Sequence, residues 1–558
     1  MLRDFFKNHP KGLLVAFFAN MGERFGYYTM LAVFVYYLQA KFGFSTEQAG
    51  KYYGGFLFGI YFLPILGGFI ADKIWGYGRT IRVGIIILFI GYLLLAIPDQ
   101  KIGFIVLALA IISLGTGLFK GNLQALVGNM YDDPLYAPNR DNAFNIFYMG
   151  INIGAFFAPS AATAASNFVL RKHNLIYDPK ILDYAHQVLH NNMQNAGLLK
   201  QFAIEHLGDK FTSITDFANY YIEAVAHSYN AAFAVAALSM VISFLIFVLF
   251  KKYYADADMT EKEKAASEKH KDKVIVLTPE QTRDRLIALG LVFFVVIFFW
   301  MAFHQNGYTL SVFAKNYTVH TVDRITYMFF DLRAFLPLLL SILGLVLFFS
   351  KKQTKIWRYI GLASFIVFAA LTYYVVRGFP DENSIAPQKF QHFNPIFIVF
   401  FTPVIVGFFT WLRKKGKEPS APRKIGIGML ITGIGFLIMV AASWGLLPPR
   451  VLGDGVSPIL RSPYWLISTY FTLTIAELFL SPMGISFVSK VSPPQYKGLM
   501  QGAWLGATAV GNLLAGLIGK FWQILELWQF FMILVVMSWL SAFFIFAVMR
   551  KLEEASQS

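Results

Sequence analysis

The chain has 558 residues, of which 56% are hydrophobic, 17% aromatic and only 14% charged. This composition excludes an ordinary soluble domain and indicates a protein that crosses a membrane many times. The formal net charge of +16 would suggest nucleic-acid binding in a soluble protein, but an excess of Lys and Arg in cytoplasmic loops accounts for it here, so we expect no nucleic-acid partner. The chain has no cysteine, which excludes disulfides and thiolate metal sites.

The first predicted spanning helix is the apolar run 13–39, preceded by Arg3, Lys7 and Lys11. Because the run is long and no small-residue cleavage site follows it, we interpret it as a membrane helix and not as a signal peptide. Within it, the stretch 20–28 reads N-M-G-E-R-F-G-Y-Y and places Glu23 and Arg24 side by side near the middle of the span.

Charged residues in that position call for a polar environment. An ionised side chain near the bilayer centre costs about 2.5–3.5 kcal/mol on insertion scales, so such groups usually face a bundle interior or a watery cavity. On a helix, Asn20, Glu23, Arg24 and Tyr27 share one face. We expect this stripe to line a cavity; the alternative is a buried ion pair that fixes helix packing.

Thirteen further runs have spanning length. In the first part of the chain they are predicted at 48–72, 81–98, 103–130, 142–166 and 222–250. After a charged stretch they are predicted at 286–318, 326–350, 356–376, 394–412, 424–446, 464–490, 497–521 and 526–549. The total of fourteen predicts an all-α polytopic membrane protein.

Loop charges give an independent test of this topology. With the N-terminus inside, every inner loop is basic, as the positive-inside rule requires. The inner loops and tail contain Lys73, Arg79, Arg82, Arg140, Lys251, Lys252, Lys351, Lys352, Lys355, Arg358, Arg413, Lys414, Lys415, Lys417, Arg423, Lys424, Lys490, Lys497, Arg550 and Lys551. We therefore predict a multi-pass protein of the plasma or inner membrane with both termini in the cytoplasm.

Two long segments do not span. The first, 166–221, is predicted to be a solvated, partly helical external loop, in which His186 and His190 stand one helical turn apart without further ligands to complete a metal site. The second, 251–285, mixes acids and bases and is predicted to be a cytoplasmic linker. We divide the chain into an N-terminal bundle (1–250), this linker, a C-terminal bundle (286–549) with an inserted helix pair (326–376), and a cytoplasmic tail (550–558).

The stretch G-G-F-I-A-D-K-I-W-G-Y-G-R-T at 67–80 ends the second helix with Asp72 and starts the third near Arg79. This spacing is similar to the inner loop of the major facilitator superfamily, where such charges latch helix ends. The fourth helix carries Lys120 among apolar residues, and the fifth carries Asn152 between small residues that permit close packing. Together with Arg24, Lys120 would be a second unneutralised positive charge facing the cavity, which suggests an anionic group on a substrate.

Five motifs carry a family resemblance. They are E-R-F-x-Y-Y on the first helix, G-T-G-x-x-K on the fourth, F-x-x-x-I-N-x-G on the fifth, F-N-P at 393–395 and A-E-L-F-L-S-P-M-G-I-S at 476–486. Together they resemble the proton-dependent oligopeptide transporter (POT) family of the major facilitator superfamily. The resemblance implies two six-helix bundles that hold a substrate between them at mid-membrane. Bacterial members have two extra helices between the halves; here the pair at 326–376 follows the helix that contains W-M-A-F-H-Q-N-G (300–307), which is a departure.

The resemblance also implies a peptide site. In it, Arg24 and Lys120 would face the peptide carboxylate, Glu477 would face the amino group, and Asn152 and Asn394 would bond to the peptide backbone. Four aromatic residues would shape the side-chain pockets: Tyr27, Tyr28, Tyr61 and Trp504. Separated charges in a medium of low dielectric suit a dipolar substrate.

The chain departs from the family at three positions that bear on gating and proton coupling. Asn20 stands where the family has a glutamate, Leu31 where it usually has an arginine, and His304 where it usually has a glutamate. That arginine and the glutamate replaced by His304 resemble a proton-sensitive latch, so their joint loss is self-consistent. We hypothesise that Glu23, His304 and Glu477 carry the coupling, since histidine has an ordinary pKa near about 6.5; the alternative is that His304 is only a satisfied polar residue.

The leading function is therefore the import of di- and tripeptides by proton symport. The alternatives are a transporter of the same fold that moves another small solute, such as an anion or a peptide-like drug, or one with altered or absent proton coupling. The sequence disfavours a receptor or a membrane enzyme, because it offers no nucleophile–base set, phosphate loop or metal cluster. We expect no cofactor and a monomer in the lipid bilayer.

Overall fold

The computed structural model describes residues 8–44, 46–208, 211–258, 277–307, 309–350, 354–385, 387–452 and 456–557. Predictions about Arg3, Lys7, Lys351, Lys352 and most of the linker concern residues outside these ranges. Within them, thirteen helical segments are long and apolar enough to cross a membrane. The helix α2 (Lys11–Phe42), which is not among these thirteen, packs beside them along α6 and α9. The prediction of an all-α polytopic protein is confirmed.

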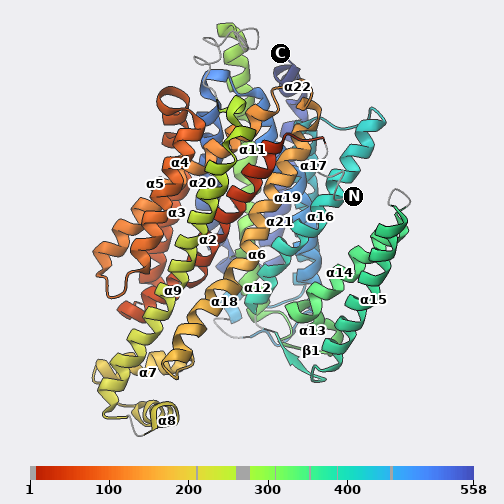
Figure 1. Cartoon of the computed structure of the whole chain (residues 1–558). Coiled ribbons are helices and arrows are strands. Elements are labelled where there is room, and N and C mark those ends of the chain that lie inside the picture. Colours follow the sequence, from red (N-terminus) through yellow and green to blue (C-terminus); the bar gives the residue numbers. More distant parts are fainter. Residues whose placement is uncertain are drawn as a thin grey trace.

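The predicted spans correspond closely to the observed helices. Those before the linker are α2, α3 (Thr46–Ile70), α4 (Tyr77–Ala96), α5 (Ile102–Met130), α6 (Arg140–Lys172) and α9 (Ile214–Leu249). Those after it are α11 (Pro279–Phe303), α14 (Leu332–Phe349), α15 (Lys355–Arg377), α16 (Phe393–Lys414), α17 (Ala421–Ser443), α19 (Tyr464–Val491), α20 (Lys497–Ile518) and α21 (Leu527–Ala547). Figure 1 shows these helices running roughly side by side, with α14 and α15 standing beside the main body near α16.

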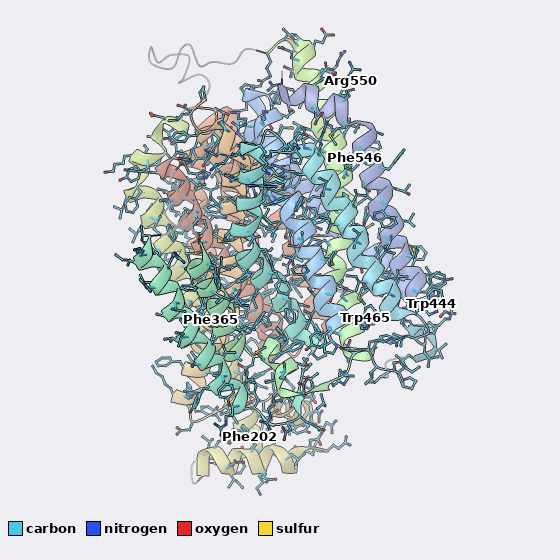
Figure 2. The ribbon with its side chains drawn as sticks, turned by 90° about the vertical axis from the view of Figure 1, so that its right-hand side faces the viewer. Phe202, Phe365, Trp444, Trp465, Phe546 and Arg550 are labelled. Carbon is cyan, nitrogen blue, oxygen red and sulfur yellow. The ribbon has the colours of Figure 1, made fainter. Side chains whose placement is uncertain are left out.

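The bundle has two distinct ends. At the charged end lie the first residues of α2, α4, α6, α17 and α20, the π-helical turn η1 (Ala71–Trp75) and the C-terminal helix α22 (Met549–Gln557). At the opposite, capped end lie α7 (Pro179–Leu189), α8 (Ala196–Leu207) and the short strands β1 (Thr321–Val322) and β2 (Asn383–Ser384). Figure 2 places Arg550 at the first end and Phe202 at the second, with Trp444 and Trp465 between them. Both tryptophans are partly exposed, as expected of side chains in a membrane-interface belt.

The non-spanning segment after α6 is shorter and more ordered than the predicted loop 166–221. The helix α6 continues to Lys172, and α9 starts at Ile214, where the Ser213 hydroxyl caps the backbone N–H of Asp216 at 3.1 Å. The Nε2 atom of His186 lies 3.0 Å from the Ala40 carbonyl at the end of α2, and the Nδ1 atom of His190 lies 2.8 Å from the carbonyl of His186. The His186 ring thus links the cap to α2, while the His190 ring makes a local contact, and no group of three or more possible metal ligands occurs among the described residues.

The inserted pair forms a hairpin of its own. The glycines Gly344 on α14 and Gly361 on α15 meet so closely that a Cβ on either would lie 2.7 Å from the other's carbonyl oxygen. The predicted helix 326–350 begins later, at Leu332, because Asp331 caps α14 through the backbone N–H of Arg333. Before it come α13 (Arg324–Tyr327) and the turn η8 (Met328–Phe330).

The insert enters and leaves through a β ribbon. Strands β1 and β2 are antiparallel, with Val322 paired to Asn383. The two ends of the insert are therefore neighbours, and the α14–α15 hairpin is an appendage to the capped end.

Other short helices complete the chain. The predicted span 286–318 is broken, since α11 ends at Phe303 and is followed by the 3-10 turn η7 (His304–Gly307) and by α12 (Thr309–Asn316). The helix α18 (Pro449–Leu452) lies between α17 and α19. After α9, residues 251–258 form the short turns η4 (Lys251–Tyr253) and η5 (Ala255–Ala257); these are the described beginning of the predicted linker.

Candidate functional site

The two charges of α2 neutralise each other. The Arg24 guanidinium donates from Nε and Nη2 to the two carboxylate oxygens of Glu23, each at 2.5 Å, and both side chains are almost fully buried. The guanidinium also lies 4.6 Å from the centre of the Tyr27 ring. The expectation that Arg24 is an unneutralised charge is therefore wrong in this structure: it belongs to a closed, bidentate ion pair.

Lys120 differs from Arg24. It lies on α5, partly exposed, with its ammonium 4.6 Å from the centre of the Tyr61 ring. Within the described residues, no hydrogen bond or ion pair of this ammonium is found. The charges of both Arg24 and Glu23 act on it, which places Lys120 beside the ion pair. Lys120 is thus a cation beside the site for which no carboxylate partner is found among the described residues.

Glu477, on α19, is the acidic counterpart in the C-terminal helices. Its carboxylate is buried and accepts hydrogen bonds from the Tyr148 hydroxyl and, at 2.7 Å, from the Asn394 side-chain amide. The same amide lies 3.1 Å from the Thr474 hydroxyl. Only neutral donors are seen around this carboxylate in the described structure, so its negative charge is available to a cationic group.

Tyr148 is the site residue that the sequence interpretation missed. It lies on α6 and reaches across to α19, so it joins helices from the two parts of the chain. The available signal was its position four residues before Asn152, on the same helical face. Asn152 itself turns back and donates to the Tyr148 carbonyl at 3.1 Å.

The other predicted site residues fall into two groups. Tyr27 and Tyr28 are in edge-to-face contact, and the charges of Arg24 and Glu477 both act on Tyr28, so Tyr28 lies near enough to feel the basic and the acidic part of the site. Trp504, in contrast, is fully buried against Gly484, where a Cβ would lie 1.9 Å from its ring. In this state Trp504 supports α19 and does not border open space.

The residues tied to proton coupling and gating are placed as follows. His304 starts η7 with its Nδ1 atom 2.8 Å from the Trp300 carbonyl and its ring against the Trp300 indole. Leu31 is a half-buried residue of α2. Asn20 is buried, and its amide lies 3.5 Å from the Phe147 carbonyl on α6. None of these contacts brings a carboxylate to His304 within the described residues.

Asp72 joins the two parts of the chain at the charged end. Its carboxylate accepts from the backbone N–H groups of Gly498 at 2.9 Å and Leu499 at 2.8 Å, in the first turn of α20. A carboxylate at a helix N-terminus is stabilised by the free N–H groups and by the helix dipole. Gly68 and Gly498 are so close that a Cβ on Gly68 would lie 2.2 Å from the Gly498 carbonyl oxygen. Arg79 is exposed at the start of α4.

Further polar contacts across the same junction lie near Asp72. Lys424 pairs with Asp141 at 2.6 Å, and Lys497 pairs with Asp132. Two further cross-links join Asn142 to Thr410 at 3.0 Å and Arg413 to Asn139 at 2.8 Å. Helices α2–α9 and α11–α21 are therefore held together from the level of Tyr148 and Glu477 to the charged end, which is closed.

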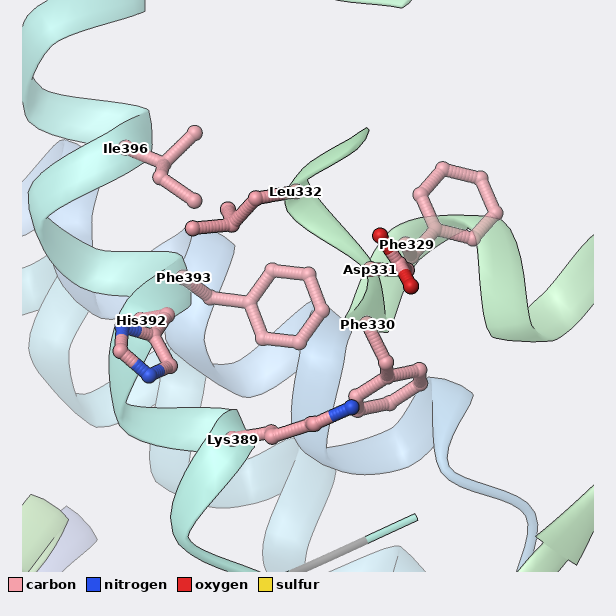
Figure 3. Close-up of a pocket in the computed structure, with 8 residues that line it drawn as sticks. All are labelled: Phe329, Phe330, Asp331, Leu332, Lys389, His392, Phe393 and Ile396. Atoms are coloured by element: carbon pink, nitrogen blue, oxygen red, sulfur yellow. The ribbon is translucent and has the colours of Figure 1, made fainter. Parts of the chain in front are cut away.

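A separate pocket of about 240 Å³ lies at the capped end (Figure 3). Its walls come from η8, α14 and α16, with the helical turn η9 (Pro387–His392) below, and it is lined by Phe329, Phe330, Asp331, Leu332, Lys389, His392, Phe393 and Ile396. Phe393 precedes Asn394, so the pocket and the Glu477 group share α16 but use different faces of it. The pocket marks the junction of the inserted hairpin with the main body.

Comparisons with known proteins agree with this architecture. The model of the POT family matches residues 78–278 and 362–526, more than half of the chain. The dipeptide and tripeptide permease B of Shigella dysenteriae serotype 1 is 28% identical over 516 residues, covering 92% of this chain and 87% of the permease. The peptide transporter YePEPT of Yersinia enterocolitica is 27% identical over 548 residues, covering 93% and 88%.

A solved structure has a similar fold. A POT family transporter in complex with 5-aminolevulinic acid superimposes with a TM-score of 0.56 at 20% identity, covering 98% of this chain and 97% of that one. At this level of identity the likeness concerns the fold alone.

Proposed function

Because the chain belongs to the POT family, we propose that it is a secondary transporter that moves di- and tripeptides across the membrane together with protons. The names of its relatives support this proposal, since one is a dipeptide and tripeptide permease and another a peptide transporter. The fold supports a transporter rather than an enzyme, because buried charges are spread over helices from both parts of the chain.

The charge pattern of the site is the observation that carries the proposal. A peptide is a dipole with an ammonium at one end and a carboxylate at the other. Glu477 is a carboxylate bonded to neutral donors, and Lys120 is a cation without a carboxylate of its own. In a low-dielectric site, each would attract the opposite end of the peptide, while Asn152, Asn394 and the tyrosines would contact its neutral parts.

We propose that the chain works as two six-helix bundles, α2–α9 and α11–α21 without the α14–α15 hairpin, that rock about the central site. The charged end, which carries the basic loops, would face the cytoplasm under the positive-inside rule. With that end closed, the present state would be the one that receives peptide from outside. Both termini would then be cytoplasmic and the protein would lie in the inner or plasma membrane as a monomer.

Proton coupling is assigned to Glu23, Glu477 and His304. When Glu477 or Glu23 takes a proton, it loses its charge and with it the attraction for an ammonium or for Arg24. The Nδ1 atom of His304 is hydrogen-bonded to the Trp300 carbonyl, so Nε2 is the ring nitrogen that would exchange a proton. This assignment replaces the arginine–glutamate latch that Leu31 and His304 remove.

Counterflow tests the substrate part of this proposal without any gradient. Liposomes that contain the purified protein and unlabelled dialanine should accumulate labelled dialanine from a dilute outside solution. Tetraalanine and N-acetylated dialanine in the outside solution should compete poorly. Tetraalanine is longer than a tripeptide, and N-acetylated dialanine has no terminal ammonium. Failure of dialanine to enter, in a preparation that is folded by thermal melting, would contradict the proposal.

A second candidate function is transport of another small solute by the same fold. The observation in its favour is the neutralised state of Arg24, which leaves fewer charges for a peptide carboxylate. A substrate without an amino group should tolerate Glu477→Gln, whereas a peptide should not.

A further inference from the structure

A group of four charges at the closed end is not part of the peptide site. Its centre is Lys424, in the first turn of α17, whose side chain is 0% exposed. Its ammonium donates to Asp141 at 2.6 Å and to Glu418 at 2.7 Å, and it lies 4.3 Å from the centre of the Phe409 ring. One buried cation is therefore shared between two carboxylates.

The two carboxylates belong to different parts of the chain. Asp141 is in the first turn of α6, before the linker, and also accepts from the Ser486 hydroxyl of α19 at 2.6 Å. Glu418 precedes α17, on the same side of the junction as Lys424, and also accepts from Arg413. If the two bundles separate at this end, Asp141 departs with one bundle and Glu418 stays with the lysine.

The second carboxylate makes the separation possible. Breaking a buried ion pair is costly chiefly because it leaves an uncompensated buried charge. When Asp141 departs, the charge of Lys424 stays compensated, because Glu418 remains at hydrogen-bond distance. Asp141 has a side chain 22% exposed already and stands at a helix N-terminus, where water and the helix dipole stabilise a free carboxylate.

The same helices connect this group to the peptide site. On α6, Asp141 and Tyr148 are seven residues apart, which is two helical turns or about 10.5 Å along one face. On α19, the partners of these residues are Ser486 and Glu477. A ligand ammonium that displaces the Tyr148 hydroxyl from Glu477 would remove one hydrogen bond between α6 and α19 and leave the bond from Ser486 to Asp141 in place.

We propose that Lys424 is a shared counter-ion that Asp141 releases and Glu418 retains when the charged end opens. Asp141 thereby stabilises the closed state, and Glu418 stabilises the open one. The inference rests on the proposed alternating access, and it deepens that proposal by assigning opposite roles to two carboxylates on one lysine.

The test uses two variants that make the same chemical change. Because the chain contains no cysteine, spin labels can be attached at Leu135→Cys and Lys417→Cys, two exposed positions on opposite sides of the junction at the charged end. Pulsed electron–electron double resonance measures the distance between the two labels, and its distribution gives the ratio of long (open) to short (closed) distances. It is measured at a pH where the labelled parent shows both.

Asp141→Asn should raise the open-to-closed ratio by roughly tenfold or more, the effect expected for the loss of a charged hydrogen bond. Glu418→Gln should lower the ratio, because an opened Lys424 would then lack a carboxylate. The matched control is Glu553→Gln, since Glu553 pairs with the neighbouring Arg423 without crossing the junction; it should leave the ratio unchanged.

A merely structural role for the two carboxylates would shift both variants in the same direction, and that result would overturn the inference. So would an unchanged ratio in Asp141→Asn. If either variant is poorly folded, the Lys424→Gln background gives a second measurement: there, adding Glu418→Gln should no longer change the ratio, and a persisting decrease would contradict the proposal. The distances are measured without substrate, so they stand or fall separately from dialanine counterflow.

Discussion

At the scale of single residues, charge compensation distinguishes Arg24 from Lys120, the two cations of the proposed peptide site. Glu23→Gln would leave the Arg24 guanidinium buried without its carboxylate, at a cost of about 3–5 kcal/mol. Lys120→Met removes an ammonium for which no ion-pair partner is found in the described structure, so it should leave thermal stability unchanged or higher. Melting of the detergent-solubilised variants measures both. A Glu23→Gln variant as stable as the parent would contradict the ion pair seen here.

Glu477 gives a prediction about recognition. A glutamine at this position can accept from the Asn394 amide through its oxygen and donate from its NH2 group to the Tyr148 hydroxyl, so Glu477→Gln should fold normally. It should weaken binding of dialanine by roughly ten- to a hundredfold, the range for a hydrogen bond to a charged group, and leave N-acetylated dialanine unaffected. Competition in counterflow measures both affinities. Equal losses of affinity for the two peptides would show that Glu477 does not bind the peptide ammonium.

His9, just before α2, gives a prediction about pH. Burial, together with the charge of Arg413, lowers the pKa of His9 to about 4, and its Nδ1 atom lies 2.5 Å from the Tyr131 hydroxyl. Because the unfolded chain binds this proton at higher pH than the folded chain, the protein should lose stability as the pH falls from about 6.5 to about 4. His9→Leu lacks this loss, so its melting temperature relative to the parent should rise over that range. A constant difference would contradict the pKa shift.

The residue scale also shows where sequence interpretation reached its limit. The polar stripe of α2 was recognisable, because Glu23 and Arg24 in an apolar run have no ordinary explanation. Their mutual pairing was not, because adjacency along a helix does not fix where two flexible side chains point. The ion pair between Asp141 and Lys424 could be predicted even less, because it joins positions 283 residues apart. From the sequence alone, Lys424 was only one more basic loop residue.

At the scale of elements, the inserted hairpin is predicted to be dispensable for transport. Val322 and Asn383 are paired across the β ribbon, so residues 323–382 can be replaced by an Asn-Gly turn, which suits a two-residue hairpin. Removal exposes Phe393, which packs against Phe330 and Phe335. In a membrane, lipid can cover that ring at little cost, since lipid tails are as apolar as the lost neighbours.

The shortened protein should therefore insert and show dialanine counterflow at a rate similar to that of the parent. Its monodispersity and melting temperature serve as the folding control. A shortened protein that is folded but inactive would show that the hairpin takes part in transport.

Element boundaries were predictable for the spanning helices and not for the short ones. A run of about 20 apolar residues has few alternatives to a membrane helix. The cap helices α7 and α8 lack such a run and are stabilised by packing on α9 and by contacts such as His186 to Ala40. The break at His304 between α11 and α12 could not be predicted from the sequence either, because the apolar pattern continues past it.

At the scale of the whole molecule, the protein is a peptide carrier that is closed on its basic side. The close Gly68–Gly498 approach, Asp72 on the first turn of α20, and the shared Lys424 all lie on that side. The basic and acidic groups of the site lie on helices from both sides of the linker. A substrate that bridges them would bias the relative position of the two bundles, as transport by alternating access requires.

The most direct test of this account is uptake of labelled dialanine into liposomes that contain the purified protein, with and without an inward proton gradient. We predict accumulation above the outside concentration only when the gradient is present, and we expect a protonophore to abolish it. Equilibration to the same level with and without the gradient would contradict proton coupling and would mean that Asn20, Leu31 and His304 have uncoupled the transporter.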